Sequence, residues 1–159
     1  MDAVTRVPAF GRDVYDFAPR WVAPAGVSRG VCCHFRIRGR VPREAWGDGR
    51  LVIAAESRYA LYVNGHHVGV GPARGVYTCN FADEYSVAGL LRDGQNVVAA
   101  EIYCDNIPSF TAAPSRPAVF IKAGDRVADE SWAVRIADDW RCEGLPQYTL
   151  MIGYIEWHD

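Results

Sequence analysis

The sequence predicts an all-β fold, an antiparallel two-sheet β-sandwich, and three observations support this prediction. The strongest is the pair Asn64-Gly65, which lies between two strand-like runs. The second is a series of short runs in which apolar and polar residues alternate, each bounded by turn residues. The third is the lack of a convincing amphipathic helix of three turns. Strands at this spacing, without such helices, are typical of β-sandwiches.

A β-hairpin is predicted around Asn64-Gly65, formed by Arg58–Val63 and His66–Val70. A type I′ turn needs positive φ at both central positions, which asparagine and glycine tolerate. Pairing outward from the turn sets Val63 against His66, Tyr62 against His67, Leu61 against Val68 and Tyr59 against Val70. The face predicted to join the core consists of Tyr59, Leu61, Val63, Val68 and Val70. The face predicted to meet water carries Arg58, Tyr62 and His67.

The remaining strands are predicted from the same alternation and from the turns Gly47–Gly49, Asp93-Gly94 and Gly124-Asp125. They are Val31–Arg38, Leu51–Glu56, Asn96–Tyr103, Pro117–Lys122 and Ser131–Ile136. In the first of them, Cys33, Phe35 and Ile37 share the inward face, and His34, Arg36 and Arg38 share the outward face. The segment Tyr85–Leu91 is predicted to hold one short helical turn.

Residues 1–30 are predicted to form an extended lead-in that packs on the domain, because they contain several prolines and glycines and little periodicity. Trp21 is the residue expected to hold this lead-in in place. Residues 31–159 are predicted to be a single β-sandwich domain, since 159 residues suit one hydrophobic core.

Charge and composition narrow the class of protein. A net charge of -2 provides no basic patch for nucleic acid or for a membrane surface. No apolar run approaches the ~20 residues of a membrane span, and no signal peptide is visible, so we expect a cytoplasmic protein. The five cysteines show no C-x-x-C spacing and are expected to be free thiols in a reducing compartment, with Cys33 buried.

No catalytic motif is visible in the chain. His66 and His67 are neighbours on a predicted strand, so their side chains point to opposite faces and cannot chelate one ion together. Glycoside hydrolysis needs two carboxylates that face each other across a cleft. The spacing of the available acids selects no such pair among Asp83, Glu84, Glu101, Asp138 and Asp139. We therefore assign no catalytic residue.

The best candidate ligand site is Asp105-Asn106, directly after the strand Asn96–Tyr103. Both side chains offer oxygen ligands suited to Ca²⁺ or to sugar hydroxyls. The alternative is an Asx-type turn that ends the strand. Three aromatic residues lie in or beside predicted loops, where they are candidates for stacking on a sugar ring: Trp46, Tyr77 and Tyr85.

Three stretches carry a resemblance to a known family. They are Arg58-Tyr-Ala-Leu-Tyr-Val-Asn-Gly65 with Val68-Gly69 and Gly71-Pro72, then Tyr85–Leu91 with Gly94–Ala99, and finally Asp129-Glu-Ser-Trp132. With these motifs the chain resembles the N-terminal β-sandwich module of bacterial α-L-rhamnosidases and related large glycoside hydrolases. The resemblance implies a galactose-binding-like jelly-roll fold. Ser86 and Asp93 depart from the family pattern, where Asp and Pro are frequent.

The resemblance also implies what the chain does. In such enzymes the catalytic carboxylates lie on a separate helical barrel downstream, so no residue here carries over as catalytic. We expect a non-catalytic accessory module, structural or weakly carbohydrate-binding, truncated from a longer multidomain glycoside hydrolase. Its expected partners are the downstream catalytic domain and a rhamnose-containing carbohydrate, since some modules of this broad kind bind rhamnose through calcium. The alternative is a stand-alone lectin-like protein whose exposed loops bind sugar.

Overall fold

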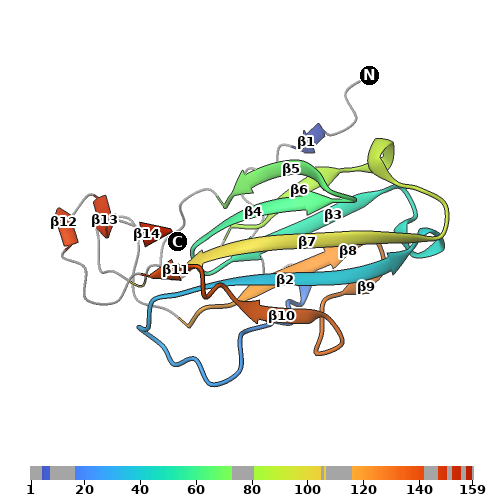
Figure 1. The fold of residues 1–159 in the computed structure, drawn as a ribbon. Coiled ribbons are helices and arrows are strands. Elements are labelled where there is room, and N and C mark those ends of the chain that lie inside the picture. Colours follow the sequence, from blue (N-terminus) through green and yellow to red (C-terminus); the bar gives the residue numbers. More distant parts are fainter. Residues whose placement is uncertain are drawn as a thin grey trace.

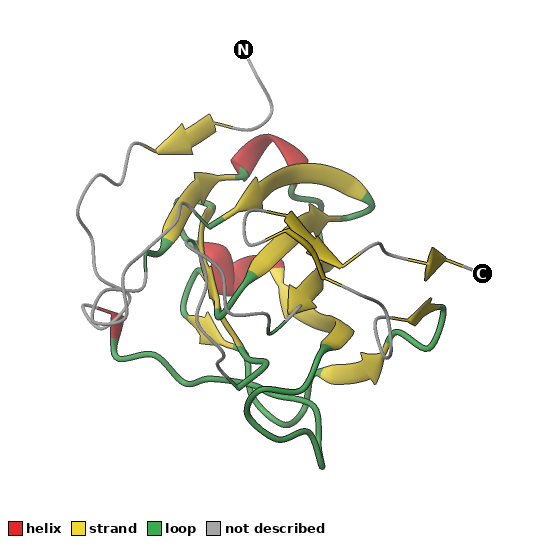
Figure 2. Ribbon diagram, turned by 90° about the vertical axis from the view of Figure 1, so that its left-hand side faces the viewer, coloured by secondary structure: helices red, strands yellow, loops and turns green. Residues whose placement is uncertain are grey.

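The protein folds as a sandwich of two five-stranded antiparallel sheets in a computed structural model (Figures 1 and 2). The structure describes residues 17–72, 81–104, 106 and 116–140, and the backbone of 5–7, 141, 147–149, 152–154 and 157–158. The first sheet has the order β1 (Thr5–Val7), β6 (Asp83–Ser86), β3 (Arg50–Ala55), β8 (Val119–Ala123), β9 (Arg126–Val127). The second has the order β10 (Ala133–Ile136), β2 (Cys33–Pro42), β7 (Gln95–Cys104), β4 (Arg58–Val63), β5 (His66–Gly71).

Smaller elements complete the described chain. They are the strand pairs β11 (Trp140–Arg141) with β14 (Trp157–His158) and β12 (Gln147–Thr149) with β13 (Ile152–Tyr154), and the 3-10 turns η2 (Arg43–Trp46) and η3 (Ala88–Leu90). The β-sandwich predicted from the sequence is confirmed, as is a helical turn within Tyr85–Leu91. Strand β6 was not predicted. Within the described residues, no helix has the length and apolar character needed to cross a membrane.

The core lies between the two sheets and follows from strict alternation along the longest strands. In β7 every second residue is buried, while the residues between them are partly exposed or, at Gln95, exposed. Phe35 and Ile37 of β2 are buried on the same inner face, as predicted. Burying side chains of this size contributes about 1.5–3 kcal/mol each. Because the inner faces of both sheets form this core, only the outer faces and the loops can contact a ligand or another segment.

The hairpin turn agrees with its prediction, because φ is 52° at Asn64 and 82° at Gly65. The pairs Val63–His66 and Tyr62–His67 also agree, and the Tyr62 and His67 rings lie 5.4 Å apart, centroid to centroid. Beyond them the register shifts at a β-bulge.

The bulge makes the rest of the predicted hairpin register wrong. Leu61 pairs with Gly69 and Tyr59 with Gly71, in place of Val68 and Val70. One extra residue reverses the alternation of everything beyond it. Val70 is consequently 62% exposed and not part of the core face, while Val68 is only partly buried against the core.

Glycines on the inner face of β5 make room for a buried polar group. A Cβ at Gly69 would lie 2.6 Å from the Tyr85 hydroxyl oxygen, and one at Gly71 would lie 2.2 Å from Asp83 Oδ2. The Tyr59 hydroxyl donates to Asp83 Oδ2 over 2.5 Å and lies 3.1 Å from the Tyr85 hydroxyl. Burial, reinforced by the bond to Asp83, raises the pKa of the Tyr59 phenol. The glycines of the Gly69–Gly71 motif are therefore required by packing.

Two asparagines connect the hairpin tip to the rest of the sheet. Asn64 Nδ2 donates to the Leu90 carbonyl and to Asn96 Oδ1, each over 2.8 Å. Asn64 Oδ1 accepts from the Val97 amide over 2.9 Å. The fully buried Asn96 also exchanges two hydrogen bonds with the Arg92 backbone. Both asparagines of the family-like motifs thus have structural roles.

The lead-in contacts the outer face of the first sheet. Val52 and Ala54 alternate with the core residues of β3, so they lie on its other face, where they form a cluster with Ala82 and Phe120. Phe17 and Trp21 pack against this cluster. The backbones of Val22 and Val119 exchange two hydrogen bonds of 2.8 and 2.9 Å. The lead-in therefore extends the first sheet beside β8.

One expectation about the cysteines is wrong. Cys33 and Cys104 are buried thiols that form no disulfide, and burial raises the pKa of the Cys33 thiol. Cys32, however, is disulfide-bonded. Neighbouring positions at a strand start point in opposite directions, so burial of Cys33 leaves Cys32 to bond elsewhere. Cys79 and Cys142 lie outside the described residues.

Candidate functional site

The predicted site after β7 is described in part. Asn106 has a φ of 52°, and its Nδ2 donates to the backbone oxygen of Val31, at the entrance to β2. This bond links Asn106 to the segment that leads into the neighbouring strand β2. Asp105 and Tyr77 lie outside the described residues. The assignment of Asp105 and Asn106 to Ca²⁺ or sugar stays a prediction.

Trp46 and Tyr85, predicted to stack on a sugar, are core residues. Trp46 is 0% exposed and its Nε1 donates to the Val41 carbonyl over 3.4 Å. Tyr85 is 2% exposed and its hydroxyl faces Tyr59. A ring must present a face to solvent to stack on a sugar, so both assignments are corrected. Position beside a loop did not reveal the direction of these side chains, which the packing of the two sheets determines.

The acids considered for catalysis all have partners. Arg36 donates to Glu101 over 2.9 Å and to Asp139 over 2.7 Å, and these bonds raise the pKa of the Arg36 guanidinium, with the Asp139 bond the larger cause. The other three partners are Tyr59 for Asp83, Arg50 for Glu84 and Arg135 for Asp138. No group of three His, Cys, Asp or Glu side chains suited to a metal ion occurs among the described residues.

His34, predicted to face outward, is only 5% exposed. Its ring lies against Tyr103 and Trp140, with centroid distances of 5.4 and 5.6 Å. The side chain does lie on the outer face of the second sheet, as the alternation predicted. The rings of Tyr103 and Trp140 shield it from solvent there, and the alternation along the strand could not predict this burial.

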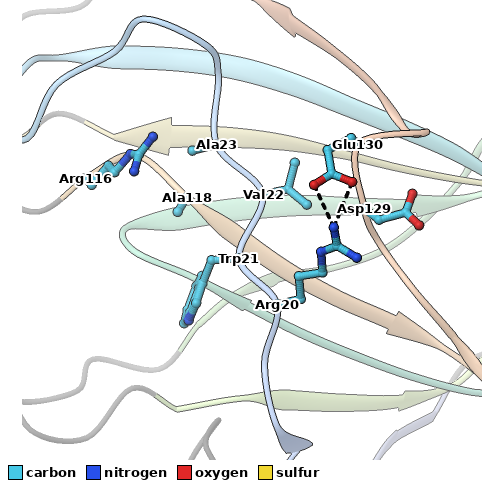
Figure 3. A pocket seen from close by; sticks show the side chains of 8 residues that line it. All are labelled: Arg20, Trp21, Val22, Ala23, Arg116, Ala118, Asp129 and Glu130. Carbon is cyan, nitrogen blue, oxygen red and sulfur yellow. Dashed lines mark hydrogen bonds and ion pairs between the residues drawn. The ribbon is translucent and has the colours of Figure 1, made fainter.

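The described surface contains a cleft assembled from three segments that lie far apart in the sequence. It has a volume of about 260 Å³ (Figure 3). Its lining residues are Arg20, Trp21, Val22 and Ala23 of the lead-in, Arg116 and Ala118 before β8, and Asp129 and Glu130 after β9. Figure 3 shows Trp21, Ala23, Arg116 and Ala118 on one side of the lead-in backbone and the acids on the other.

An ion pair closes the acidic side of this cleft. Arg20 Nη2 lies 2.6 Å from Glu130 Oε1 and 2.8 Å from Oε2, between residues 110 positions apart. The backbone amide of Glu130 itself, and then Arg20, lower the pKa of the Glu130 carboxyl. The pair therefore remains ionised at neutral pH and links the lead-in to the loop after β9.

Asp129 serves mainly to shape its loop. Its Oδ1 accepts from the Ser131 hydroxyl over 2.6 Å and from the Ser131 amide over 2.9 Å, and both bonds lower the pKa of the carboxyl. The following Trp132 packs where a Cβ at Gly39 would lie 2.1 Å from its ring. The family-like Asp129–Trp132 motif thus builds a turn and a core contact beside the cleft.

The other side of the cleft combines an aromatic ring with a guanidinium. Trp21 is half-buried because part of it packs on the outer-face cluster, and the remainder lines the cleft. Arg116 is exposed, and no carboxylate of the described residues forms an ion pair with it. Trp21 was predicted only to hold the lead-in in place, and Arg116 was not predicted at all, because nothing in the sequence relates two positions so far apart.

Comparison with solved structures shows where this fold occurs. The chain is similar to the family GH78 rhamnosidase of Bacillus sp. GL1, with a TM-score of 0.78 and 27% identity over 94% of this chain and 16% of that one. It is also similar to the α-L-rhamnosidase from Dictyoglumus thermophilum, with a TM-score of 0.61 and 17% identity over 77% of this chain and 17% of that one.

A lectin from Pleurotus ostreatus is more distant, with a TM-score of 0.48 and 22% identity over 89% of this chain and 40% of that one, and supports no functional argument. The sequence matches no protein-family model and no curated protein. The structural resemblance to α-L-rhamnosidases predicted from the motifs is confirmed, and the chain spans about a sixth of the length of the rhamnosidases it matches.

Proposed function

We propose that this chain is a non-catalytic accessory module of a larger glycoside hydrolase of the α-L-rhamnosidase type. One observation carries the proposal: 94% of this chain, but only 16% of the Bacillus rhamnosidase, takes part in the match. A match of nearly the whole chain to a small part of a large enzyme supports a chain that forms one module of such an enzyme. The partner that this proposal requires is a catalytic domain in the same polypeptide.

The chemistry of the described acids supports a non-catalytic role. Both classes of glycosidase need one carboxyl group as an acid and a second as a base or nucleophile, across a cleft. Glu101 and Asp139 are both bonded to Arg36, and Asp83 is buried beneath β5. The two acids in the described cleft serve an ion pair and a turn.

The module is further proposed to bind carbohydrate weakly. The supporting feature is the cleft, where a half-buried tryptophan and an exposed arginine lie on one side. Aromatic rings combine a large apolar face with low conformational freedom, which suits them to pack on sugar rings. Calcium at Asp105 and Asn106 stays a separate prediction.

We further propose that this module works in an oxidising environment. Disulfides persist in oxidising environments, so the bonded Cys32 favours an exported protein over the cytoplasmic one expected from the sequence. Thiol titration of the unfolded protein, with and without reductant, measures this bond.

Two assays of the purified chain test the proposed function. We expect no turnover of an aryl α-L-rhamnoside, and retarded migration in a gel that contains a rhamnose-rich polysaccharide. Turnover that disappears when a single carboxylate of this chain is replaced would refute the non-catalytic role. Unretarded migration would contradict binding of the module to a rhamnose-rich carbohydrate.

A further inference from the structure

We propose that the side of the cleft formed by Trp21 and Arg116 binds a sugar residue that carries a carboxylate, a hexuronate, in preference to a neutral sugar. The proposal rests on the carbohydrate-binding part of the proposed function and specifies its ligand. It places this ligand on the lead-in side of the first sheet and assigns it to residues other than Asp105 and Asn106, where the sequence predicted a site.

The guanidinium of Arg116 supplies the charge selectivity. The other arginine of the cleft, Arg20, is already bonded to both oxygens of Glu130. Arg116 has no such partner among the described carboxylates, so its donors are available to a ligand. A planar guanidinium binds a carboxylate through two parallel hydrogen bonds, which a neutral hydroxymethyl group cannot reproduce.

The acids of the cleft do not oppose an anionic ligand on this side. Figure 3 shows the Asp129 carboxylate directed away from Trp21 and Arg116. Its Oδ1 is bonded to Ser131, and Glu130 is neutralised by Arg20. Among the residues that line this side of the cleft, Arg116 is the one that carries a charge.

Trp21 and two alanines supply the shape. The tryptophan packs on the cluster of Val52, Ala54, Ala82 and Phe120, which limits its motion. Ala118 lies between Trp21 and Arg116 in Figure 3 and Ala23 lies beside Arg116, and the short side chains of both leave space there. The two hydrogen bonds between Val22 and Val119 fix the spacing of these segments.

The size of the cleft limits the ligand to one sugar ring. Its volume of about 260 Å³ lies below the ~300–1,000 Å³ of sites for drug-sized ligands. We therefore expect weak, monosaccharide-sized binding, with an affinity in the millimolar range.

The test compares D-galacturonate with D-galactose, which differ only in the carboxylate at C6. Binding is followed by NMR of the indole N–H signals, with the Trp21 signal assigned from Trp21→Phe. We expect galacturonate to shift that signal and to bind at least about fivefold more tightly than galactose, a difference that falls with salt. Arg116→Ala should remove the difference between the two sugars.

A matched control is Arg40→Ala, because Arg40 is exposed on β2 of the other sheet and also lacks an ion pair with any described carboxylate. It should retain the full preference for galacturonate. Equal affinity for both sugars, or a preference that survives Arg116→Ala, overturns the proposal. Absence of any shift at Trp21 overturns it too, while retention by a rhamnose-rich polysaccharide would show that the broader carbohydrate-binding function still holds.

Discussion

The hairpin β4–β5 and the cleft beside the lead-in differ in how their residues are brought together. In the hairpin, the turn residues and the first two residue pairs lie within six positions of sequence, Tyr62 to His67. In the cleft, Arg20 contacts Glu130 across 110 positions, and Arg116 comes from a third segment. Most of β4 is buried and the inner face of β5 packs closely on Tyr59, Asp83 and Tyr85, whereas the charged groups of the cleft are exposed. Changes in the hairpin should therefore alter stability, and changes in the cleft should alter binding.

The largest expected effect is that of Gly71→Ala in the hairpin. The new Cβ would lie 2.2 Å from Asp83 Oδ2, so the buried Tyr59–Asp83 contact must move. Overpacking of this kind costs about 1–3 kcal/mol, and disturbance of a buried hydrogen bond places this change near the upper end. Urea unfolding measures it. A variant as stable as the wild type would show that β5 does not pack as described.

Asn64→Ala should have the next largest effect on stability. It removes three side-chain hydrogen bonds, to Leu90, Asn96 and Val97, and leaves the buried Asn96 without one partner. The expected cost in unfolding free energy is about 2 kcal/mol.

Gly65→Val separates backbone strain from hydrogen bonding, because a Cβ at Gly65 meets no atom within 4 Å while φ is 82°. That strain alone should cost about 1–2 kcal/mol. A loss from Asn64→Ala no larger than this would mean that the network contributes little.

Alkaline pH should weaken the buried polar group beneath β5. The folded-state pKa of Tyr59 is raised, so its contribution is fully present below the unfolded pKa near 10 and is lost as the pH rises above it. The slope for one such group approaches about 1.4 kcal/mol per pH unit. Unfolding free energies of the wild type and Tyr59→Phe, measured from pH 8 upward, should converge. Parallel curves would contradict the burial of this phenol.

The smallest expected effect on stability is that of Arg20→Ala in the cleft. The pair with Glu130 is exposed on both sides, with side chains 56% and 85% accessible. Exposed pairs contribute about 0–1 kcal/mol and are screened by salt. A double-mutant cycle with Glu130→Ala, run at low and high salt, measures the coupling. A coupling well above this range would show that the lead-in is anchored by charge more than by Trp21.

The sequence by itself determined the features that depend on neighbouring residues. Alternation predicted the buried face of β2, and Asn64-Gly65 predicted the turn with positive φ at both positions. The three motifs predicted the resemblance to rhamnosidases that the comparison of structures confirmed. These properties follow from local backbone preferences and from a side-chain period of two, so a single segment contains enough information.

Only the tertiary structure decided the features that depend on which segments meet. The bulge that exposes Val70 arises where β5 must clear Tyr59, Asp83 and Tyr85, two of which belong to β6. Trp46 and Tyr85 were predicted to be exposed because they lie near loops, yet packing between the sheets buries both. The cleft required Val22 to pair with Val119, which brought Trp21 and Arg116 to one side. Long-range packing and pairing set these positions, because no local preference along the chain distinguishes a buried aromatic residue from an exposed one.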